Sequence, residues 1–517
     1  MKNAGKIMIN TLLLTGASFL MQTVGVSFNV WLTARMGSVG IGLFQLIMTV
    51  YNLAVTLGCG GVRLAATRLT VESEARGESV RKTVVTCIKY AFVTGTLIAF
   101  ALISLSDIAA KYWLSDMRSA APLRILALSL PFVSMSSALN GYFTAVKKVF
   151  RYSAVRIAEQ GVKIAIVMFL MSRLLPYGIE YGSIAIIIGI LLSEAFSFTL
   201  LIILYNTEKK KYREKAQNSG LKRILHIAVP DVSGAGARSV LLTIEHLLIP
   251  KGFEKSGSSA SQALSVYGNI HGMVFPLILY PSAILSSLSS LLIPEIASHR
   301  ENRRDSRITY IIARVMKITL IFSIGTAGIF YIFADGLSYV IYNSYECADY
   351  IRMLSVLIPV MYCDMTVDGI LKGMDQQMYS MWYNIIDSAL CVVLVAVLLP
   401  KFAVKGYIFI LFASEIINFF LSIQRLMKVC EVDVRPVKEI FVPICCIICS
   451  SCSVSLLCTL TGFTAIYTEL TLAVAIVMTA MVYVLFLYGF STLTREDITW
   501  FSEASGIHHL KNRCVNA

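Results

Sequence analysis

Long apolar stretches recur along almost the whole chain, and they constrain its fold more than any other feature. Each holds about 20 or more mostly apolar residues, which as a helix spans the ~30 Å hydrocarbon core of a bilayer. The 517 residues are 56% hydrophobic and 15% charged, with a mean hydropathy of +0.72, which excludes an ordinary soluble protein. We therefore predict an all-α polytopic membrane protein with about fourteen transmembrane helices. The fourteen windows are 7–32, 40–66, 83–105, 121–143, 154–175, 182–205, 224–249, 264–294, 309–333, 350–371, 380–400, 406–427, 437–459 and 467–490.

The placement of Lys and Arg predicts how these helices are oriented. The N-terminus, the C-terminus and every second connection together hold 29 basic residues, whereas the other connections hold 10. Loops rich in Lys and Arg stay on the cytoplasmic side, so we expect a multi-pass membrane protein with both termini in the cytoplasm. The formal net charge of +14 is then a topology signal, and we expect no nucleic-acid partner.

The chain contains an internal repeat. Residues 122–168 slide by 228 positions onto 350–396 without gaps. The superimposed pairs include Arg124 and Arg352, Leu126 and Leu354, Pro131 and Pro359, Gly141 and Gly369, and Glu159 and Asp387. A repeat with an even number of helices predicts two lobes that run in the same direction around a pseudo-two-fold axis along the membrane normal, an arrangement associated with alternating access. The predicted parts are an N-lobe of helices 1–6 at 1–205, a basic cytoplasmic linker at 206–223, a C-lobe of helices 7–12 at 224–430, helices 13 and 14 at 431–490, and a cytoplasmic tail at 491–517.

The window at 224–249 carries Asp231, Arg238 and Glu245 at a spacing of seven. Seven residues are just under two helical turns, so the three charges lie on one stripe and drift by only ~20° per step. A charge at the bilayer centre costs ~2.5–3.5 kcal/mol on insertion scales, so these groups should face protein or water. The stripe predicts a helix that lines a hydrated cavity. Alternatively, the three residues form internal ion pairs that hold helices together.

Several short segments carry a resemblance to a known family. They are Gly141-Tyr142-Phe143, Glu159-Gln160, Lys163-Ile164, 176–181, 292–296, 367–373 and 383–387. Over nearly its whole length the chain is similar to the stage V sporulation protein B family within the multidrug/oligosaccharidyl-lipid/polysaccharide (MOP) flippase superfamily. The resemblance implies a flippase for a lipid-linked peptidoglycan or polysaccharide precursor, with spore cortex synthesis as its setting. It also implies that helices 13 and 14 form a groove for the lipid tail. The chain departs from its relatives at Arg63, where proline is common; this arginine either adds a charge at the cytoplasmic mouth or extends toward the interface.

The cargo of such a flippase joins a polyisoprenoid chain to sugars through pyrophosphate, so the protein needs a cation for the phosphates. Arg238 is the best candidate because it lies in mid-helix and a guanidinium binds phosphate through two hydrogen bonds. Glu245 matches an acid of the relatives, and together with Asp231 it is expected to hold Arg238 when cargo is absent or to bind a cation or proton. Gly234 and Gly236 provide for bending of the helix or for close helix packing.

Other polar groups inside the windows have structural and functional interpretations. Glu159 and Lys163 lie four residues apart and can neutralise each other, as a structural pair or within the cavity. Asp364 and Asp368 share this spacing but have like charges, which suits proton or sodium coupling; alternatively, Asp368 lies near the cytoplasmic interface. Pro276 and Pro281 are expected to kink the eighth helix, either as part of a gate or as a packing feature.

The sequence favours a transporter over an enzyme. It contains no nucleophile elbow or phosphate-cradling loop, and its short basic loops do not suit a membrane glycosyltransferase. We expect no cofactor and no metal, since the cysteines between 445 and 452 have no histidine or acidic residue beside them. The expected partners are a polyprenyl-pyrophosphate-linked oligosaccharide, membrane lipids and cell-wall synthesis enzymes, with the chain acting as a monomer. The alternatives are a proton- or sodium-coupled exporter of drugs or metabolites from the same superfamily, and a non-transporting scaffold.

Overall fold

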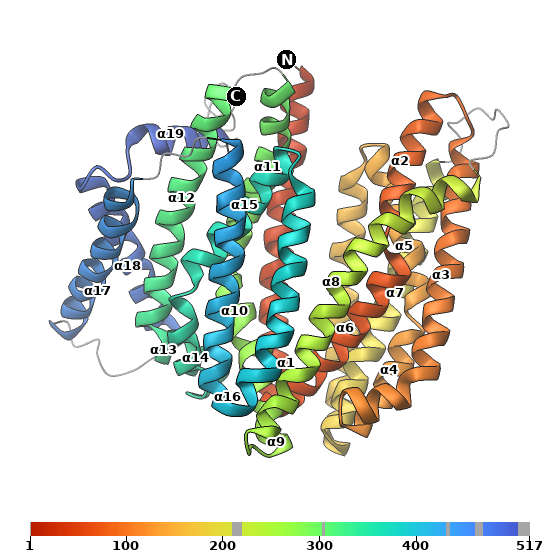
Figure 1. Cartoon of the computed structure of the whole chain (residues 1–517), viewed down its shortest axis with the longest axis horizontal. Coiled ribbons are helices and arrows are strands. Elements are labelled where there is room, and N and C mark those ends of the chain that lie inside the picture. Colours follow the sequence, from red (N-terminus) through yellow and green to blue (C-terminus); the bar gives the residue numbers. More distant parts are fainter. Residues whose placement is uncertain (1, 209–219, 302–304, 431–434, 461–468, 505–517) are drawn as a thin grey trace. The chain divides into compact units, whose positions relative to one another are not determined.

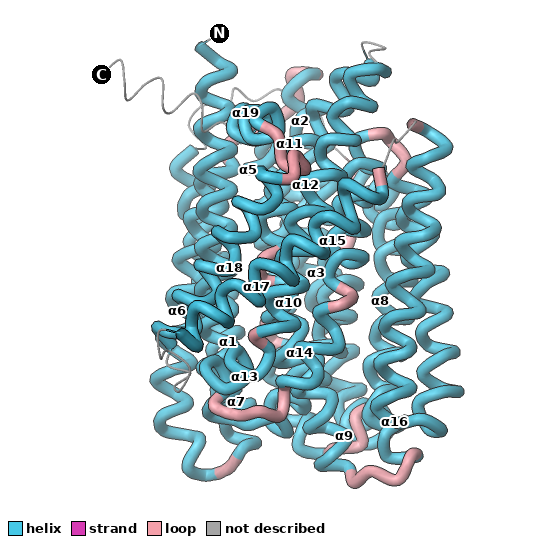
Figure 2. Tube along the Cα trace, turned by 90° about the vertical axis from the view of Figure 1, so that its left-hand side faces the viewer, coloured by secondary structure: helices cyan, strands magenta, loops and turns pink. Residues whose placement is uncertain are grey.

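The computed structural model describes residues 2–208, 220–301, 305–430, 435–460 and 469–504 (Figure 1). Throughout these ranges the chain is built from helices joined by short connections, and no strand is found in them (Figure 2). The prediction of an all-α fold is confirmed. The fourteen predicted windows are helical over most of their described residues, with turns inside them at 60–61, 128–129, 280–281 and 356–357. Parts of the predicted linker 206–223, of 431–490 and of the tail 491–517 lie outside the described residues.

The chain divides into two compact units. Unit 1 comprises Met1–Arg35 and Asn269–Ala517, and unit 2 comprises Met36–Gly268. The boundary near residue 36 falls within the first helix, α1 (Lys2–Cys59), which is interrupted at Gly37 with φ 68° and ψ 177°. Only glycine adopts this backbone conformation readily, so Gly37 divides α1 into two segments. The lobe bounds predicted from the repeat, 1–205 and 224–430, are a separate division and stay a prediction.

Side-chain hydrogen bonds connect the first segment of α1 to the rest of unit 1. The Thr23 hydroxyl lies 2.8 Å from the hydroxyl of Tyr280. The Asn29 amide nitrogen donates to the carbonyl of Gly272 over 2.6 Å. Interhelical hydrogen bonds of this kind are a common means of helix association in membranes.

Unit 2 is a bundle built on the second segment of α1. Its other helices are α2 (Val62–Ala75), α3 (Val80–Ile108), α4 (Ala120–Ala127), α5 (Leu130–Ala145), α6 (Val149–Leu174), α7 (Ile179–Glu208), α8 (Leu221–Lys255) and α9 (Ala260–Tyr267). Helix α3 begins after Ser79, whose side chain accepts a hydrogen bond from the Lys82 amide, and α9 begins with a capping box of Ser259 and Gln262. Two apolar clusters fill the interior, one around Ala66, Ala91 and Ala138 and one around Leu139, Tyr142 and Phe143.

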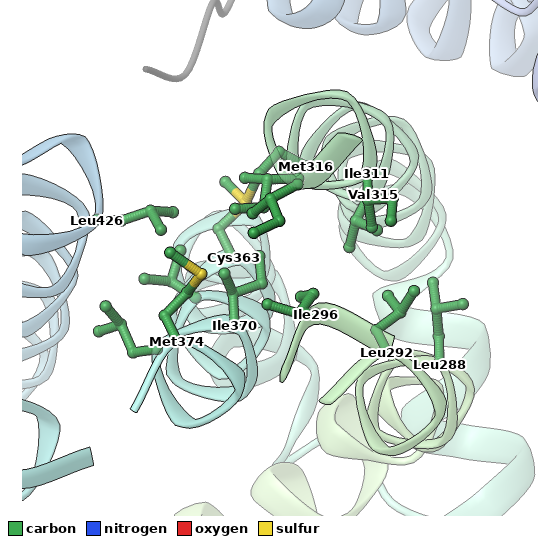
Figure 3. Close-up of a cluster of buried hydrophobic side chains, with 14 residues drawn as sticks. Leu288, Leu292, Ile296, Ile311, Val315, Met316, Cys363, Ile370, Met374 and Leu426 are labelled. Carbon is green, nitrogen blue, oxygen red and sulfur yellow. The ribbon is translucent and has the colours of Figure 1, made fainter. Parts of the chain in front are cut away.

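Unit 1 contains the remaining helices. They are α10 (Phe275–Leu279), α11 (Ser282–Glu301), α12 (Asp305–Ile332), α13 (Ala334–Tyr342), α14 (Ala348–Ser355), α15 (Ile358–Gly373), α16 (Gln377–Val429), α17 (Val442–Leu460), α18 (Glu469–Gly489) and α19 (Arg495–Ala504). A π-helix at Gly268–Val274 precedes α10. Buried side chains of α11, α12, α15 and α16 form a shared core, in which Ile296, Ile311 and Ile370 are almost fully buried (Figure 3).

Eight of the described helices are long and apolar enough to cross a membrane, or up to eleven if each of three bent pairs counts as one span. Two of the eight are 57 and 53 residues long, namely Phe19–Ala75, which covers most of α1 together with α2, and Gln377–Val429, which is α16. At 1.5 Å per residue each reaches about 80 Å, which is enough for two crossings. They are interrupted at Gly37 and at Ala403, where φ is 47°. The exact number of fourteen spans stays a prediction.

The structure repeats with the same 228-residue shift as the sequence. This shift carries both ends of α4 onto those of α14, both ends of α5 onto those of α15, and the start of α6 onto the start of α16. Each short helix meets the next at a bend, of 44° between α4 and α5 and 55° between α14 and α15. In both copies a proline, Pro131 or Pro359, lies in the first turn after the bend, where its missing N–H costs nothing.

An ion pair recurs at the same positions of the repeat. Arg124 Nη2 lies 2.5 Å from Asp107 Oδ2 in unit 2, and Arg352 Nη2 lies 2.6 Å from Asp335 Oδ2 in unit 1. The unusual left-handed residues coincide as well, at Ser115 and Asn343, with φ values of 54° and 52°. The two copies therefore share backbone details that low sequence identity does not reveal.

Candidate functional site

A two-glycine turn between α1 and α2 forms the base of the candidate site. Gly61 has φ 69°, and a Cβ atom there would lie 2.4 Å from the Cα of Ala228 in α8. Glycine is therefore required at this position both for its backbone conformation and for the close approach of α8. The turn brings the first residues of α2 next to the N-terminal third of α8.

A cavity of about 640 Å³ opens beside this turn, within unit 2. Its lining residues are Val55, Thr56, Cys59, Gly60, Gly61, Arg63, Leu64, Thr67, Ser137, Thr144 and Asp231. Two of the four predicted substrate-binding residues, Arg63 and Asp231, thus share one cavity although they are far apart in the sequence. Hydroxyl groups of Thr and Ser supply most of the other polar surface, so the cavity suits a polar, charged ligand.

The charged stripe of α8 runs from an exposed to a buried position. Asp231 and Arg238 are exposed, whereas Glu245 is only 9% exposed. Helix α8 is continuous from Leu221 to Lys255, so seven residues separate neighbouring charges by about 10 Å along the axis. In the described part of the chain, the guanidinium groups of Arg63 and Arg238 have no carboxylate within 4.0 Å. The expected pairing of Arg238 with Asp231 or Glu245 is absent from this conformation.

The predicted bending residues occupy different surroundings. Gly234 and Gly236 lie within the unbroken helix α8, and a Cβ atom at Gly236 would lie 3.3 Å from a methyl carbon of Leu57. Pro276 is in the first turn of α10, which follows the π-helix. Pro281 lies at the junction of α10 and α11, where the chain bends by 59°. The kink expected in this span is therefore located at Pro281.

A buried group of charges lies between α6 and α7. Glu159 is paired with Arg156, with Nη1 to Oε2 at 2.7 Å, and the same nitrogen lies 3.7 Å from Glu194 Oε1. The predicted partner of Glu159 was Lys163, which lies one turn further along α6. Arg156 was not among the predicted site residues, although it lies within the predicted window 154–175. The signal was available, since residues three apart on a helix lie on one face.

The two predicted ion-coupling acids of α15 have separate partners. The amide nitrogen of Asn418 donates to Asp364 Oδ2 over 3.0 Å, and the Ser380 hydroxyl donates to Asp368 Oδ1 over 2.5 Å. Asp364 is 8% exposed and Asp368 is half-buried. On α16, Asp387 accepts a hydrogen bond from Ser414 over 2.6 Å. These three acids of α15 and α16 thus each accept a hydrogen bond from a neutral amide or hydroxyl group.

With this geometry in place, comparison with solved structures identifies the class of fold. The chain is similar to a lipid II flippase, MurJ, in an inward closed conformation, with a TM-score of 0.70 and 16% identity over 92% of this chain and 98% of that chain. It is also similar to an inward-facing multidrug resistance MATE family transporter of the MOP superfamily, with a TM-score of 0.63 and 14% identity over 81% of this chain and 98% of the transporter. The chain therefore has the same fold as these two transport proteins.

Comparison with known sequences finds one matching family profile and two related proteins. Residues 7–249 match the profile of the polysaccharide biosynthesis protein family. Stage V sporulation protein B of Bacillus subtilis (strain 168) is 24% identical over 441 residues, which cover 83% of this chain and 85% of that protein. Sporulation protein YkvU of the same organism is 20% identical over 353 residues, 66% of this chain and 77% of that protein. In sequence the chain is thus similar to polysaccharide biosynthesis and sporulation proteins.

Proposed function

We propose that the protein flips a polyprenyl-pyrophosphate-linked oligosaccharide across the bacterial plasma membrane by alternating access. The observation that carries the proposal is the polar cavity of unit 2, which contains Arg63 beside α8, the helix that presents Arg238. A similar fold in a lipid II flippase supports it.

The diphosphate is the part of the cargo that most needs the protein. Its charges cannot enter hydrocarbon without a compensating group, whereas the polyprenyl chain can stay in the bilayer. Neither Arg63 nor Arg238 is engaged by a carboxylate of the described chain, so both guanidinium groups are available to phosphate oxygens. Guanidinium binds phosphate with two parallel hydrogen bonds, which fixes its orientation as well as its charge.

The acids and glycines of α8 have supporting roles in this proposal. Asp231 lies in the cavity with Arg63 and would hold this arginine after the phosphate leaves. Glu245 is buried one stripe position further and would either hold Arg238 when no cargo is bound or bind a cation or proton when Arg238 contacts the phosphates. Bending of α8 at Gly234 and Gly236 would supply such a movement, because glycine relaxes the steric limits of the backbone.

The lipid tail and the physiological setting are inferred more indirectly. Helices α17 and α18 expose large apolar side chains such as Leu456, Leu470 and Leu485, which suits contact with lipid tails. The sporulation relatives in Bacillus subtilis support a role in spore cortex or cell-wall synthesis, beside the enzymes of that pathway. The distribution of Lys and Arg supports cytoplasmic termini.

Asp364 and Asp368 are our candidates for coupling transport to a proton or sodium ion. Both lie on α15, one turn apart, and each carboxylate accepts a hydrogen bond from a neutral donor. Replacing Asp364 with Asn should make transport independent of an imposed gradient while slow exchange continues. Unchanged gradient dependence would remove Asp364 from this role.

Transport in proteoliposomes tests the proposal. The probe is a fluorescent polyprenyl-pyrophosphate oligosaccharide, and the variants are Arg63→Ala, Arg238→Ala and Glu245→Gln. Loss of a charge-assisted phosphate contact should slow flipping at least about tenfold in the two arginine variants, with insertion and abundance unchanged. The controls are Arg68→Ala on α2, whose side chain is 67% exposed and pairs with Glu72, and Lys222→Ala in the first turn of α8.

Two results would overturn the proposal. Equal rates in Arg63→Ala, Arg238→Ala and the controls would show that the cavity does not handle the phosphates. Absence of lipid movement, together with gradient-driven export of a soluble cation, would replace the flippase with a coupled exporter.

A further inference from the structure

A second cavity lies at the other end of α8, also within unit 2. It has a volume of about 490 Å³. The residues that line it are Val39, Leu46, Trp113, Leu114, Ser115, Asp116, Arg118, Leu247, Pro250, Lys251, Glu254, Ala260, Ser261 and Leu264. Asp231 of the first cavity and Lys251 of the second are 20 residues apart on one helix, which is about 30 Å, the thickness of the hydrocarbon core. The connections 106–124 and 250–263 border this cavity. Both belong to the alternate connections that are poor in Lys and Arg, which are expected outside the cell.

We propose that this second cavity binds an uncharged saccharide, and we name it the release-side pocket. The inference rests on the proposed function only for the source of the sugar, which would be the glycan of the lipid-linked cargo after it has crossed the membrane.

Trp113 supplies the surface that a sugar ring requires. It ends a π-helical turn at Ala109–Trp113 and is 40% exposed. The faces of an aromatic ring carry partial negative charge, and the C–H groups on the apolar face of a pyranose carry partial positive charge, so the two stack. Val39, Leu46 and Leu247 continue this apolar wall.

Asp116 supplies a fixed hydrogen-bond acceptor beside the ring. Arg118 holds it through both carboxylate oxygens, at 2.9 and 2.6 Å, and the Arg118 amide donates to it over 3.0 Å. Burial alone would raise the pKa of Asp116, but these hydrogen bonds and the charge of Arg118 hold the pKa below its ordinary value. The carboxylate is therefore ionised and oriented before a ligand arrives, as in preorganised sites.

Lys251 positions the opposite wall. Its ammonium group donates to the backbone carbonyl of Tyr112, which ties the end of α8 to the turn that carries Trp113. An ammonium has three N–H donors, so two remain for hydroxyl groups of a ligand. Arg118 and Lys251 balance Asp116 and Glu254, so the cavity has no net charge. This balance disfavours pyrophosphate and suits a neutral polyhydroxyl ligand, in contrast to the cavity of Arg63.

The residues that would bind a sugar in the release-side pocket do not recur in the second copy of the repeat. The 228-residue shift carries Trp113, Asp116 and Arg118 onto Ile341, Ser344 and Glu346 in unit 1. The backbone of the two turns is nevertheless alike, because Ser115 and Asn343 share the same left-handed conformation. One copy of a common turn has thus acquired an aromatic ring with a charged pair.

Calorimetric titration of the full-length protein in detergent tests this inference. The probes are a soluble disaccharide without lipid or phosphate, and inorganic pyrophosphate. We expect saturable binding of the disaccharide to the native protein, with affinity reduced about tenfold or more in Trp113→Leu and Asp116→Asn. Trp113→Phe, which keeps an aromatic face, should bind within a few-fold of native. Tyr177→Leu is the matched control, because Tyr177 is a 75% exposed aromatic residue outside the cavity.

The outcomes separate this inference from the proposed function. Absence of disaccharide binding, or equal affinity in Trp113→Leu and Tyr177→Leu, would overturn the inference, and so would pyrophosphate binding that depends on Lys251. None of these results would change the expected dependence of lipid flipping on Arg63 and Arg238. Conversely, disaccharide binding that requires Trp113 would stand even if no lipid were flipped. The unfolding temperature of each variant shows whether lost binding reflects lost structure.

Discussion

The two copies of the repeat have the same framework but different chemistry inside it. Helices α4–α6 of unit 2 and α14–α16 of unit 1 begin and bend at matching residues, and each copy has an Asp–Arg pair at the same place. The buried polar positions differ. The 228-residue shift pairs Arg156 with Asn384, Glu159 with Asp387, Lys163 with Cys391, and Glu194 with Ser422.

This difference separates what the fold needs from what a function needs. Prolines after the bends, left-handed turn residues and the Asp–Arg pair occur in both copies, so they serve the framework. Within the matched helices, Glu159 of α6 is held by an ion pair, whereas its counterpart Asp387 of α16 accepts a hydrogen bond from a neutral hydroxyl group. Both candidate cavities also belong to unit 2. We therefore assign cargo recognition mainly to unit 2.

Breaking the buried ion pair should have the largest effect on stability. Arg156→Ala would remove the ion-pair partner of Glu159, whose side chain is 6% exposed, and leave only the charge of Lys163 one turn away. Such a loss typically costs about 3 kcal/mol or more. Asn384→Ala in unit 1 removes only a neutral hydrogen bond to Ser380 and should cost about 1 kcal/mol. Unfolding temperatures in one detergent would measure both, and equal shifts would contradict the contrast between the copies.

The equivalent glycines Gly141 and Gly369 should differ next. A Cβ atom at Gly141 would lie 2.5 Å from the backbone oxygen of Arg63, whereas at Gly369 it would lie 2.9 Å from the side chain of Ser289. A backbone yields less readily than a side chain, so we expect about 2–3 kcal/mol for Gly141→Ala and about 1 kcal/mol for Gly369→Ala. Thermal unfolding of the two variants measures this difference. A larger cost at Gly369 would show that unit 1 is the more tightly packed copy.

Unit 1 has an additional ionic contact that titrates. Burial would raise the pKa of Asp497 on α19, but hydrogen bonds from Lys317 and Thr494 hold the pKa below its ordinary value. This carboxylate therefore stabilises the folded state above its unfolded pKa of about 3.9, and the stabilisation is lost as the pH falls through the lower, folded value. The unfolding temperature should fall more steeply between about pH 5 and pH 3 in the native protein than in Asp497→Asn. Parallel curves would contradict this assignment. The 228-residue shift carries Thr86 and Lys89 of α3 onto Arg314 and Lys317 of α12.

The recurring Asp–Arg pairs should have the smallest effects, and similar ones. The side chains of Arg124 and Asp107 are 50% and 58% exposed, and those of Arg352 and Asp335 are 33% and 47% exposed. Exposed ion pairs contribute at most about 1 kcal/mol, so Arg124→Ala and Arg352→Ala should each shift the unfolding temperature only slightly. A large effect in one copy alone would show that the pair is not a shared element of the framework.

Hydrophobicity and the repeat predicted most of the architecture. The apolar windows coincide with helices because a bilayer admits few alternatives to a helix of this length. The shift found in the sequence reproduces the helix ends to the residue, since the same proline and turn positions control both copies. The packing of the first segment of α1 in unit 1 was not predictable, because hydrogen bonds such as Thr23 to Tyr280 join residues far apart in the sequence.

The candidate site was predicted only in part. The charged stripe indicated α8, of which Asp231 lines the cavity, and Arg63 was noted as a departure from relatives. Nothing in the sequence joined Arg63 and Asp231 in one cavity. The feature that brings them together is the Gly60-Gly61 turn, which allows α8 to approach only because glycine has no side chain. Trp113 was missed because it lies between two predicted helices, where aromatic residues are common. Arg156 was missed because only Lys163 was considered as a partner of Glu159.

The most direct test of the account is the affinity of the protein for a diphosphate headgroup. Binding of a polyprenyl pyrophosphate is compared with binding of the same lipid as its alcohol, in the native protein, Arg63→Gln, Arg238→Gln and Arg425→Gln. Arg425 is the control cation of unit 1, where it is held by Gln376 and by the ring of Tyr379. We predict that the preference for pyrophosphate falls about tenfold or more in the two unit 2 variants and is unchanged in Arg425→Gln. A preference that survives in the unit 2 variants, or is lost in Arg425→Gln, would contradict the assignment of phosphate recognition to unit 2.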